Sequence, residues 1–196
     1  MQPNIPNTLT WARIVLIPLF VGVFYLPASW LGLADKNFWA CVMFVLAAVT
    51  DWFDGYLARS FNQVSALGRF LDPIADKLLV GAVLMMLAAF DRVSPASVLP
   101  AVVILLREIL VSGLREFLAE IRIGMPVSRL AKWKTGIQMV ALSVLLVGDY
   151  GPSELPVRLL GEVCLWVAAV LTMVTGWDYL RSGLKHMRPN PTKADS

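Results

Sequence analysis

The sequence predicts an all-α integral membrane protein, a bundle of six transmembrane helices with both termini in the cytoplasm. Three observations support this prediction: apolar residues make up 58% of the 196 and gather in six long blocks, Pro and Gly separate the blocks, and basic residues are distributed unevenly between the connections. Soluble globular chains are about 45–50% apolar and about 25% charged, whereas this chain is only 16% charged. The composition therefore favours a membrane protein over a soluble one.

The six apolar blocks are each long enough to cross the hydrocarbon core of a bilayer, which takes about 20 residues of helix. We expect helices over residues 10–27, 37–60, 67–90, 96–121, 130–147 and 159–184. The gaps contain Pro or Gly, which interrupt helices, and Asn7 stands where a cap of the first helix is expected. Residues 1–186 form one transmembrane domain in this interpretation, and residues 187–196 form a disordered polar tail.

The positions of the basic residues predict the orientation in the membrane. Of the 17 Lys and Arg residues, only Lys36, Arg92 and Arg158 fall on one side, and the other 14 fall on the side that holds both termini. Cytoplasmic segments carry the excess of Lys and Arg in membrane proteins. This distribution also accounts for the net charge of +3, so nothing in the charge indicates binding to nucleic acid.

Four aspartates interrupt the apolar blocks where the second expected helix ends and the third begins. Asp51 and Asp54 are three residues apart, and Asp72 and Asp76 are four apart, so each pair lies on one face of its helix. The connection between these helices is short, so we expect the two pairs to converge near the cytoplasmic surface. Charged groups at membrane depth are costly and need partners. Divalent cations are the partners that a set of converging carboxylates favours.

The donor set and its surroundings indicate the kind of ligand. Carboxylate oxygens with no His or Cys cluster favour Mg²⁺ or Mn²⁺, and two ions are typical of phosphoryl chemistry. Gly55 and Ala58 share the helical stripe of the first two aspartates and leave room for a ligand, while Arg59 provides a cation for phosphate. The alternative is that the aspartates form structural ion pairs with Arg59, Arg69 or Lys77.

A second group of charged residues lies in or beside the cytoplasmic parts of the fourth and fifth expected helices. Arg107 and Arg115 are eight residues apart, about two helical turns, so both can face one cavity. Together with Lys134 they suit a dianionic acceptor such as glycerol 3-phosphate. The alternative is that these cations pair with Glu108, Glu116 and Glu120 along the same helix, or that some of them serve only the membrane topology.

The aspartate segment resembles the CDP-alcohol phosphatidyltransferase family, whose signature is D-x2-D-G-x2-A-R-x8-G-x3-D-x3-D. Every fixed position of the signature is matched, by Asp51, Asp54, Gly55, Ala58, Arg59, Gly68, Asp72 and Asp76. The resemblance implies that the four aspartates hold two divalent ions on the pyrophosphate of a CDP-linked lipid. It also implies that Gly55 and Ala58 face the nucleotide. Asp76, which lies four residues after Asp72 on the same face of the helix, would be the general base that takes the proton of the acceptor hydroxyl.

Further matches resemble the bacterial members of the family that use glycerol 3-phosphate. They are Asn4-Ile5-Pro6-Asn7 with Leu9-Thr10 and Arg13, then Arg107-Glu108-Ile109, Leu114-Arg115-Glu116, Lys132 and Lys134-Thr135. The resemblance implies transfer of a phosphatidyl group from CDP-diacylglycerol to glycerol 3-phosphate, by a homodimer in the inner membrane of a bacterium. Asn7 and Thr10 would contact the nucleotide, although helix capping explains them as well.

Three alternatives stay open at this point. Another acceptor, such as inositol phosphate, serine or a second lipid, would keep the same chemistry. A divalent-cation transporter would use the aspartates as an ion path, but such sites lie near the midplane of the bilayer. A structural scaffold would tolerate replacement of Asp72.

Overall fold

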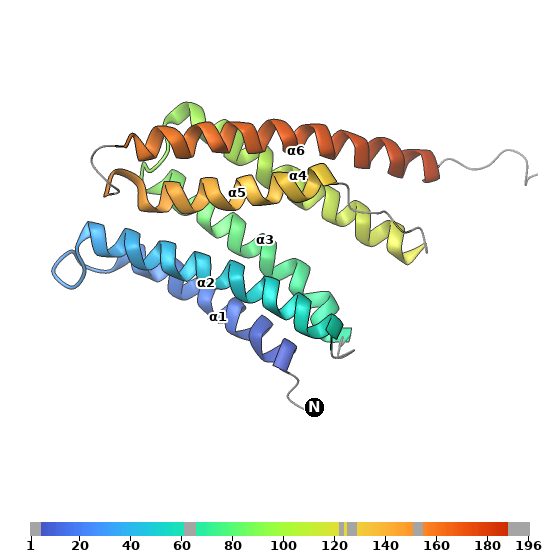
Figure 1. Cartoon of the computed structure of the whole chain (residues 1–196), viewed down its shortest axis with the longest axis horizontal. Coiled ribbons are helices and arrows are strands. Elements are labelled where there is room, and N and C mark those ends of the chain that lie inside the picture. The colour runs from blue at the N-terminus through green and yellow to red at the C-terminus, as the bar shows by residue number, and fades with distance from the viewer. Residues whose placement is uncertain (1–4, 61–65, 122–123, 125–128, 151–154, 188–196) are drawn as a thin grey trace, which may run out of the picture.

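The computed structural model of the chain is a bundle of six long α-helices in the residues that it describes (Figure 1). These residues are 5–60, 66–121, 124, 129–150 and 155–187; for some of them, including Asn7, Asp54, Gly55, Ala58 and Arg59, only the backbone is described. The helices are α1 (Ile5–Tyr25), α2 (Leu33–Ser60), α3 (Ala66–Ala89), α4 (Pro95–Glu120), α5 (Arg129–Val147) and α6 (Val157–Met187), and a short 3₁₀ helix η1 (Gly148–Tyr150) follows α5. Six helices were expected, and six are present.

The first two helices begin earlier than the sequence predicted. Helix α1 begins at Ile5 instead of residue 10, so Asn7 lies inside it and the expected cap at Asn7 is wrong. Pro6 does not interrupt the helix because an amide hydrogen is not needed in the first turn. Helix α2 begins at Leu33 instead of residue 37, with Asp35 in its first turn, where a negative charge is favourable. The predicted tail, residues 187–196, lies outside the described residues except for Met187.

The helices form two groups of three. Helix α1 packs against α2 and α3, and α6 packs against α4 and α5; contacts of α2 with α5 and of α3 with α4 join the groups. In Figure 1 the two groups diverge toward the end where α2 ends and α3 begins. The two groups therefore part at the end of the bundle that carries the aspartates.

The core lies where all six helices meet. Each helix contributes a side chain with 0% exposure, namely Phe20, Phe44, Leu87, Ile104, Leu142 and Leu165. Many large apolar side chains instead lie on the outer surface, among them Leu106, Ile109, Val163 and Val170. A soluble monomer rarely exposes so much apolar surface, so this exterior is typical of a helix bundle in lipid.

Four segments among the described residues are long and apolar enough to cross a membrane. They are Leu33–Asp51, Pro95–Glu120, Arg129–Tyr150 and Val157–Leu184; α1 contributes a shorter apolar stretch, Thr10–Tyr25. Helix α3 is absent from this set, and its first half carries Asp72, Asp76 and Lys77. An all-helical protein with four candidate spans is thus established, while six spans and the orientation of the termini stay predictions.

Polar contacts connect the helices at the end of the bundle opposite the four signature aspartates. The Lys36 ammonium donates to the carbonyl oxygens of Phe24 (3.5 Å) and Leu26 (2.5 Å), which satisfies carbonyl groups at the end of α1. Glu162 of α6 accepts hydrogen bonds from the Ser94 amide (2.8 Å) and the Ser94 hydroxyl (2.7 Å) at the start of α4. This end is therefore held together while the other end diverges.

Candidate functional site

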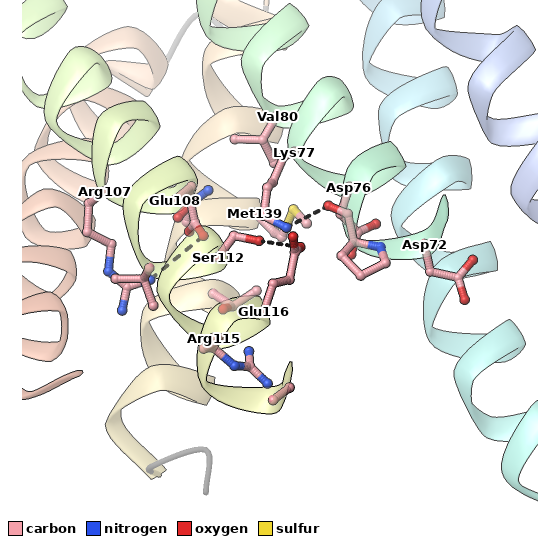
Figure 2. Close-up of a pocket in the computed structure, with 15 residues that line it drawn as sticks. Asp72, Asp76, Lys77, Val80, Arg107, Glu108, Ser112, Arg115, Glu116 and Met139 are labelled. Atoms are coloured by element: carbon pink, nitrogen blue, oxygen red, sulfur yellow. Dashed lines mark hydrogen bonds and ion pairs between the residues drawn. The ribbon is translucent and has the colours of Figure 1, made fainter. Parts of the chain in front are cut away.

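A cavity of about 560 Å³ opens between α3, α4 and α5 (Figure 2). In Figure 2, Asp72 and Asp76 stand on one side of it, and Arg107 and Arg115 on the other. The charged residues that line the cavity are Asp72, Asp76, Lys77, Arg107, Glu108, Arg115 and Glu116, and its neutral polar lining consists of Ser112, Thr135 and Gln138. The cavity therefore brings together members of both charged groups that the sequence singled out.

A buried arginine of α1 joins two of the four aspartates. Arg13 is 2% exposed, and its Nη1 atom lies 2.7 Å from Asp51 Oδ1 and 3.3 Å from Asp76 Oδ1. One nitrogen atom thus contacts a carboxylate from α2 and a carboxylate from α3. Because both oxygens lie within 3.3 Å of it, the expected convergence of the two helices' carboxylates is present for this pair.

The structure describes only some of the other residues that were predicted to bind the CDP-linked lipid. Asp72 lines the cavity and accepts a hydrogen bond of 2.5 Å from the Thr10 hydroxyl of α1. Thr10 therefore contacts an aspartate directly. The side chains of Asp54, Gly55, Ala58, Arg59 and Asn7 lie outside the described part of the structure, so their predicted roles stay predictions.

The described aspartates offer the type of donor atom that a hard divalent cation binds, and two of them converge. Their donors are carboxylate oxygens, which Mg²⁺ and Mn²⁺ prefer. Asp51 and Asp76 converge on the positive charge of Arg13, so the structure already places a cation between them. Among the described side chains, no group of three acidic, His or Cys residues is close enough to hold an ion. Asp54, whose side chain lies outside the described part of the structure, would complete the predicted set of four carboxylates.

Arg107 lines the cavity from α4 and is held in place by α6. Its Nη2 donates to the Thr175 hydroxyl (3.0 Å), and its guanidinium carbon lies 5.8 Å from the centre of the Tyr179 ring. Gly176 makes this approach possible, because a Cβ atom there would lie 2.9 Å from Arg107 Cγ. Arg107 is therefore a fixed cation in the cavity wall.

Lys134 does not line the cavity, although the sequence placed it with the two arginines. It is 3% exposed, and its ammonium group forms an ion pair with Glu108, whose carboxylate lies 3.7 Å from Arg107. Lys134 thus pairs with Glu108 between α5 and α4, while the contact of Arg107 with Glu108 lies within α4, which is the pairing along one helix that we considered. Lys134 supports the cavity wall from behind.

Two other charged residues of the wall, Glu116 and Lys77, have hydrogen-bond partners of their own. Glu116 accepts a hydrogen bond of 3.2 Å from Ser112. The Lys77 ammonium donates to the Pro73 carbonyl (2.7 Å), and among the described side chains no aspartate is in direct contact with it. Arg115 lines the cavity next to these groups.

Sequence reasoning missed three residues of this region. Arg13 was part of a recognised motif, and its spacing of three from Thr10 places both on one face of α1, which is the signal that could have found it. Glu108 was considered only as a partner within its own helix. Gln138 carries no sequence signal, since a single neutral amide in an apolar helix matches no pattern.

Comparison with known proteins agrees with this site. Residues 3–174 match the CDP-alcohol phosphatidyltransferase family. A protein of Rickettsia felis named CDP-diacylglycerol–glycerol-3-phosphate 3-phosphatidyltransferase is 49% identical over 186 residues, which cover 95% of this chain and 98% of that protein. Proteins of the same name from Shigella flexneri serotype 5b and Cereibacter sphaeroides are 47% and 37% identical, over 92% and 96% of this chain and 94% and 99% of those proteins.

The family match covers most of the chain, and the relatives match it nearly from end to end. The match includes α1 to α5, which supply the aspartates, Arg13 and all the residues that line the cavity. The chain belongs to the CDP-alcohol phosphatidyltransferase family.

Proposed function

We propose that this protein is an enzyme that transfers the phosphatidyl group of CDP-diacylglycerol to glycerol 3-phosphate, giving phosphatidylglycerophosphate and CMP. The observation that carries the proposal is a cavity that has carboxylates of α3 on one side and arginines of α4 on the other. The first wall suits metal-assisted attack at phosphorus, and the second suits the phosphate of the acceptor. The names of the relatives support this choice of substrates.

The donor side of the reaction belongs to the aspartates in this proposal. Asp51, Asp54, Asp72 and Asp76 would hold two ions, Mg²⁺ or Mn²⁺, which when bound neutralise charge on the pyrophosphate and on the departing CMP. Arg13 keeps Asp51 and Asp76 oriented through its shared nitrogen. The nucleotide would lie against Gly55, Ala58 and Arg59 of α2 and near Asn7 and Thr10 of α1.

The acceptor side belongs to α4 and to Asp76. Arg107 and Arg115 bind the phosphate of glycerol 3-phosphate, and Lys134 supports Arg107 through Glu108. Asp76 takes the proton of the acceptor hydroxyl as general base. The hydroxyl oxygen forms a bond to the phosphorus of the phosphatidyl group, the bond from that phosphorus to the CMP oxygen breaks, and CMP leaves.

The lipid substrate requires a site that opens to the bilayer. An apolar groove of about 360 Å³ lies between α2 and α5, and Met139 lines both this groove and the polar cavity. This arrangement supports entry of the acyl chains from the side while the headgroup reaches the aspartates. We further propose six spans with both termini in the cytoplasm, a location in the inner membrane of a bacterium, and a homodimer.

The decisive experiment measures incorporation of radiolabelled glycerol 3-phosphate into lipid by the purified protein with CDP-diacylglycerol. We expect turnover with Mg²⁺ or Mn²⁺ and none after chelation, almost none in Asp76→Asn, and a raised KM for the acceptor in Arg107→Ala. Asp178→Asn on the exposed part of α6 is the control and keeps wild-type rates. Preference for inositol phosphate or serine would refute the acceptor, and ion flux into vesicles without CMP release would favour a transporter.

A further inference from the structure

Gln138 of α5 is a buried polar residue in the wall of the cavity. It is 3% exposed and lines the cavity together with Thr135 and Met139. Its Oε1 atom is shielded from solvent and has no hydrogen-bond partner in the part of the chain that the structure describes. A buried amide oxygen without a partner is unfavourable, so it needs a reason such as a ligand.

The three walls of the cavity differ in chemistry. Helix α3 contributes Asp72 and Asp76, α4 contributes Arg107 and Arg115, and α5 contributes only neutral side chains. In the proposed reaction the acceptor presents its reacting hydroxyl to α3 and its phosphate to α4. A third polar group on an acceptor bound in this way would face α5, where Gln138 carries the buried amide.

We propose that Gln138 recognises the non-reacting hydroxyl of a polyol phosphate acceptor and so selects glycerol 3-phosphate over phosphates that lack this group. This inference rests on the proposed function, because it assumes that the cavity binds the acceptor. An amide suits the task, since it both accepts and donates hydrogen bonds without adding charge to a cavity that already holds seven charged side chains. Rotation about the last side-chain bond presents either Oε1 or Nε2 to the hydroxyl.

The selectivity depends on whether the bound acceptor offers the Gln138 amide a hydroxyl to hydrogen-bond. An acceptor that lacks the hydroxyl leaves the buried oxygen unpaired, whereas glycerol 3-phosphate satisfies it. Sites built to hydrogen-bond a substrate hydroxyl reject analogues that lack it much more strongly than apolar pockets reject an extra methylene. Gln138 is thus a specificity-determining residue.

The test compares two acceptors, glycerol 3-phosphate and 3-hydroxypropyl phosphate, which keeps the phosphate and the reacting hydroxyl but lacks the central one. With full-length protein and CDP-diacylglycerol, we expect wild type to prefer glycerol 3-phosphate at least about tenfold in kcat/KM. In Gln138→Met, which keeps the length of the side chain, kcat/KM for glycerol 3-phosphate falls about tenfold, and that for the analogue changes less than about twofold.

A matched control is available at the other end of the bundle. Asn37 is 1% exposed, and its Nδ2 donates to the Val147 carbonyl (3.2 Å). Its Oδ1 is also buried and has no partner among the described residues, but Asn37 does not line the cavity. Asn37→Leu leaves the ratio between the two acceptors at its wild-type value. If Gln138→Met is too unstable to purify, Gln138→Ser replaces it. The ratio of kcat/KM between the two acceptors is then compared between Gln138→Ser and wild type.

The outcomes separate this inference from the proposed function. A wild-type enzyme that uses both acceptors equally well, or a Gln138→Met variant that loses both activities in parallel, overturns the role of Gln138 and leaves the reaction intact. A wild-type protein that uses neither acceptor while it releases CMP with another alcohol overturns the proposed function instead. Collapse of the ratio in Gln138→Met alone supports the inference.

Discussion

The ion pair between Lys134 and Glu108 allows a quantitative test of how the cavity wall is held. Lys134 is 3% exposed, and Glu108 is its partner among the described residues. Glu108 has a second cation, Arg107, at 3.7 Å. The two partners are therefore unequal: removal of Glu108 strands a buried ammonium group, whereas removal of Lys134 leaves Glu108 beside Arg107.

The expected losses of stability follow from this difference between Glu108 and Lys134. Loss of one partner of a buried pair costs about 3–5 kcal/mol, while replacement of both by apolar side chains is often close to neutral. We expect Glu108→Leu to lower the free energy of unfolding by about 3–5 kcal/mol. Because its carboxylate partner keeps Arg107, Lys134→Met costs only about 1–2 kcal/mol. The double variant is more stable than Glu108→Leu alone.

The assay is unfolding of the purified variants in mixed micelles by increasing amounts of SDS, followed by far-UV circular dichroism. A double-mutant cycle then gives the coupling between the two side chains, which we expect to be at least about 1.5 kcal/mol. Strictly additive losses would refute the ion pair. A larger loss in Lys134→Met than in Glu108→Leu would refute the role assigned to Arg107 as the second partner.

Three further predictions concern other contacts of the bundle. Arg13→Gln lowers kcat at least about tenfold in a CMP-release assay, because Asp51 and Asp76 lose their shared donor; unchanged kcat would remove Arg13 from the site. Gly176→Leu displaces the Arg107 side chain, so the KM for glycerol 3-phosphate rises about tenfold while kcat changes little, and an unaltered KM would contradict this. Glu162→Leu removes the acceptor of four hydrogen bonds, from the Ser94 amide, the hydroxyls of Ser94 and Ser97, and Arg158 Nε. It costs about 2–4 kcal/mol of stability in the SDS assay and leaves both KM values unchanged; altered KM values would show that this end of the bundle acts on the site.

The sequence predicted the helices well because two strong signals coincide in this chain. Apolar blocks mark the spans, and Pro or Gly marks the gaps, so the ends of α3, α4 and α5 agree with expectation to within one residue. The two signals conflict at the amino-terminal ends of α1 and α2. Pro6 reads as an interruption but lies in the first turn of α1, and Lys36 reads as a connecting cation but caps the end of α1 from within α2.

The candidate site could be predicted only in part, for a physical reason. The spacing of Asp72 and Asp76 places them on one face of a helix, and both do line the cavity. Spacing cannot say which face of one helix meets which face of another. Contacts such as that between Arg13 and Asp76, which are 63 residues apart, and the burial of Lys134 behind Glu108 therefore needed the structure.

The order of the cavity walls along the chain has a consequence for protein engineering. All the carboxylates assigned to the donor precede the end of α3, and both arginines assigned to the acceptor follow the start of α4. Between them lies a tight turn in which Asp91 adopts φ 53° and the Arg92 amide donates to the Leu87 carbonyl at 2.9 Å. A crossover at this turn separates the four aspartates, including the proposed general base Asp76, from the arginines and Gln138 that are assigned to binding the incoming alcohol. Chimeras joined there should exchange the preferred alcohol as one unit while cleavage of the nucleotide lipid is inherited from the other parent.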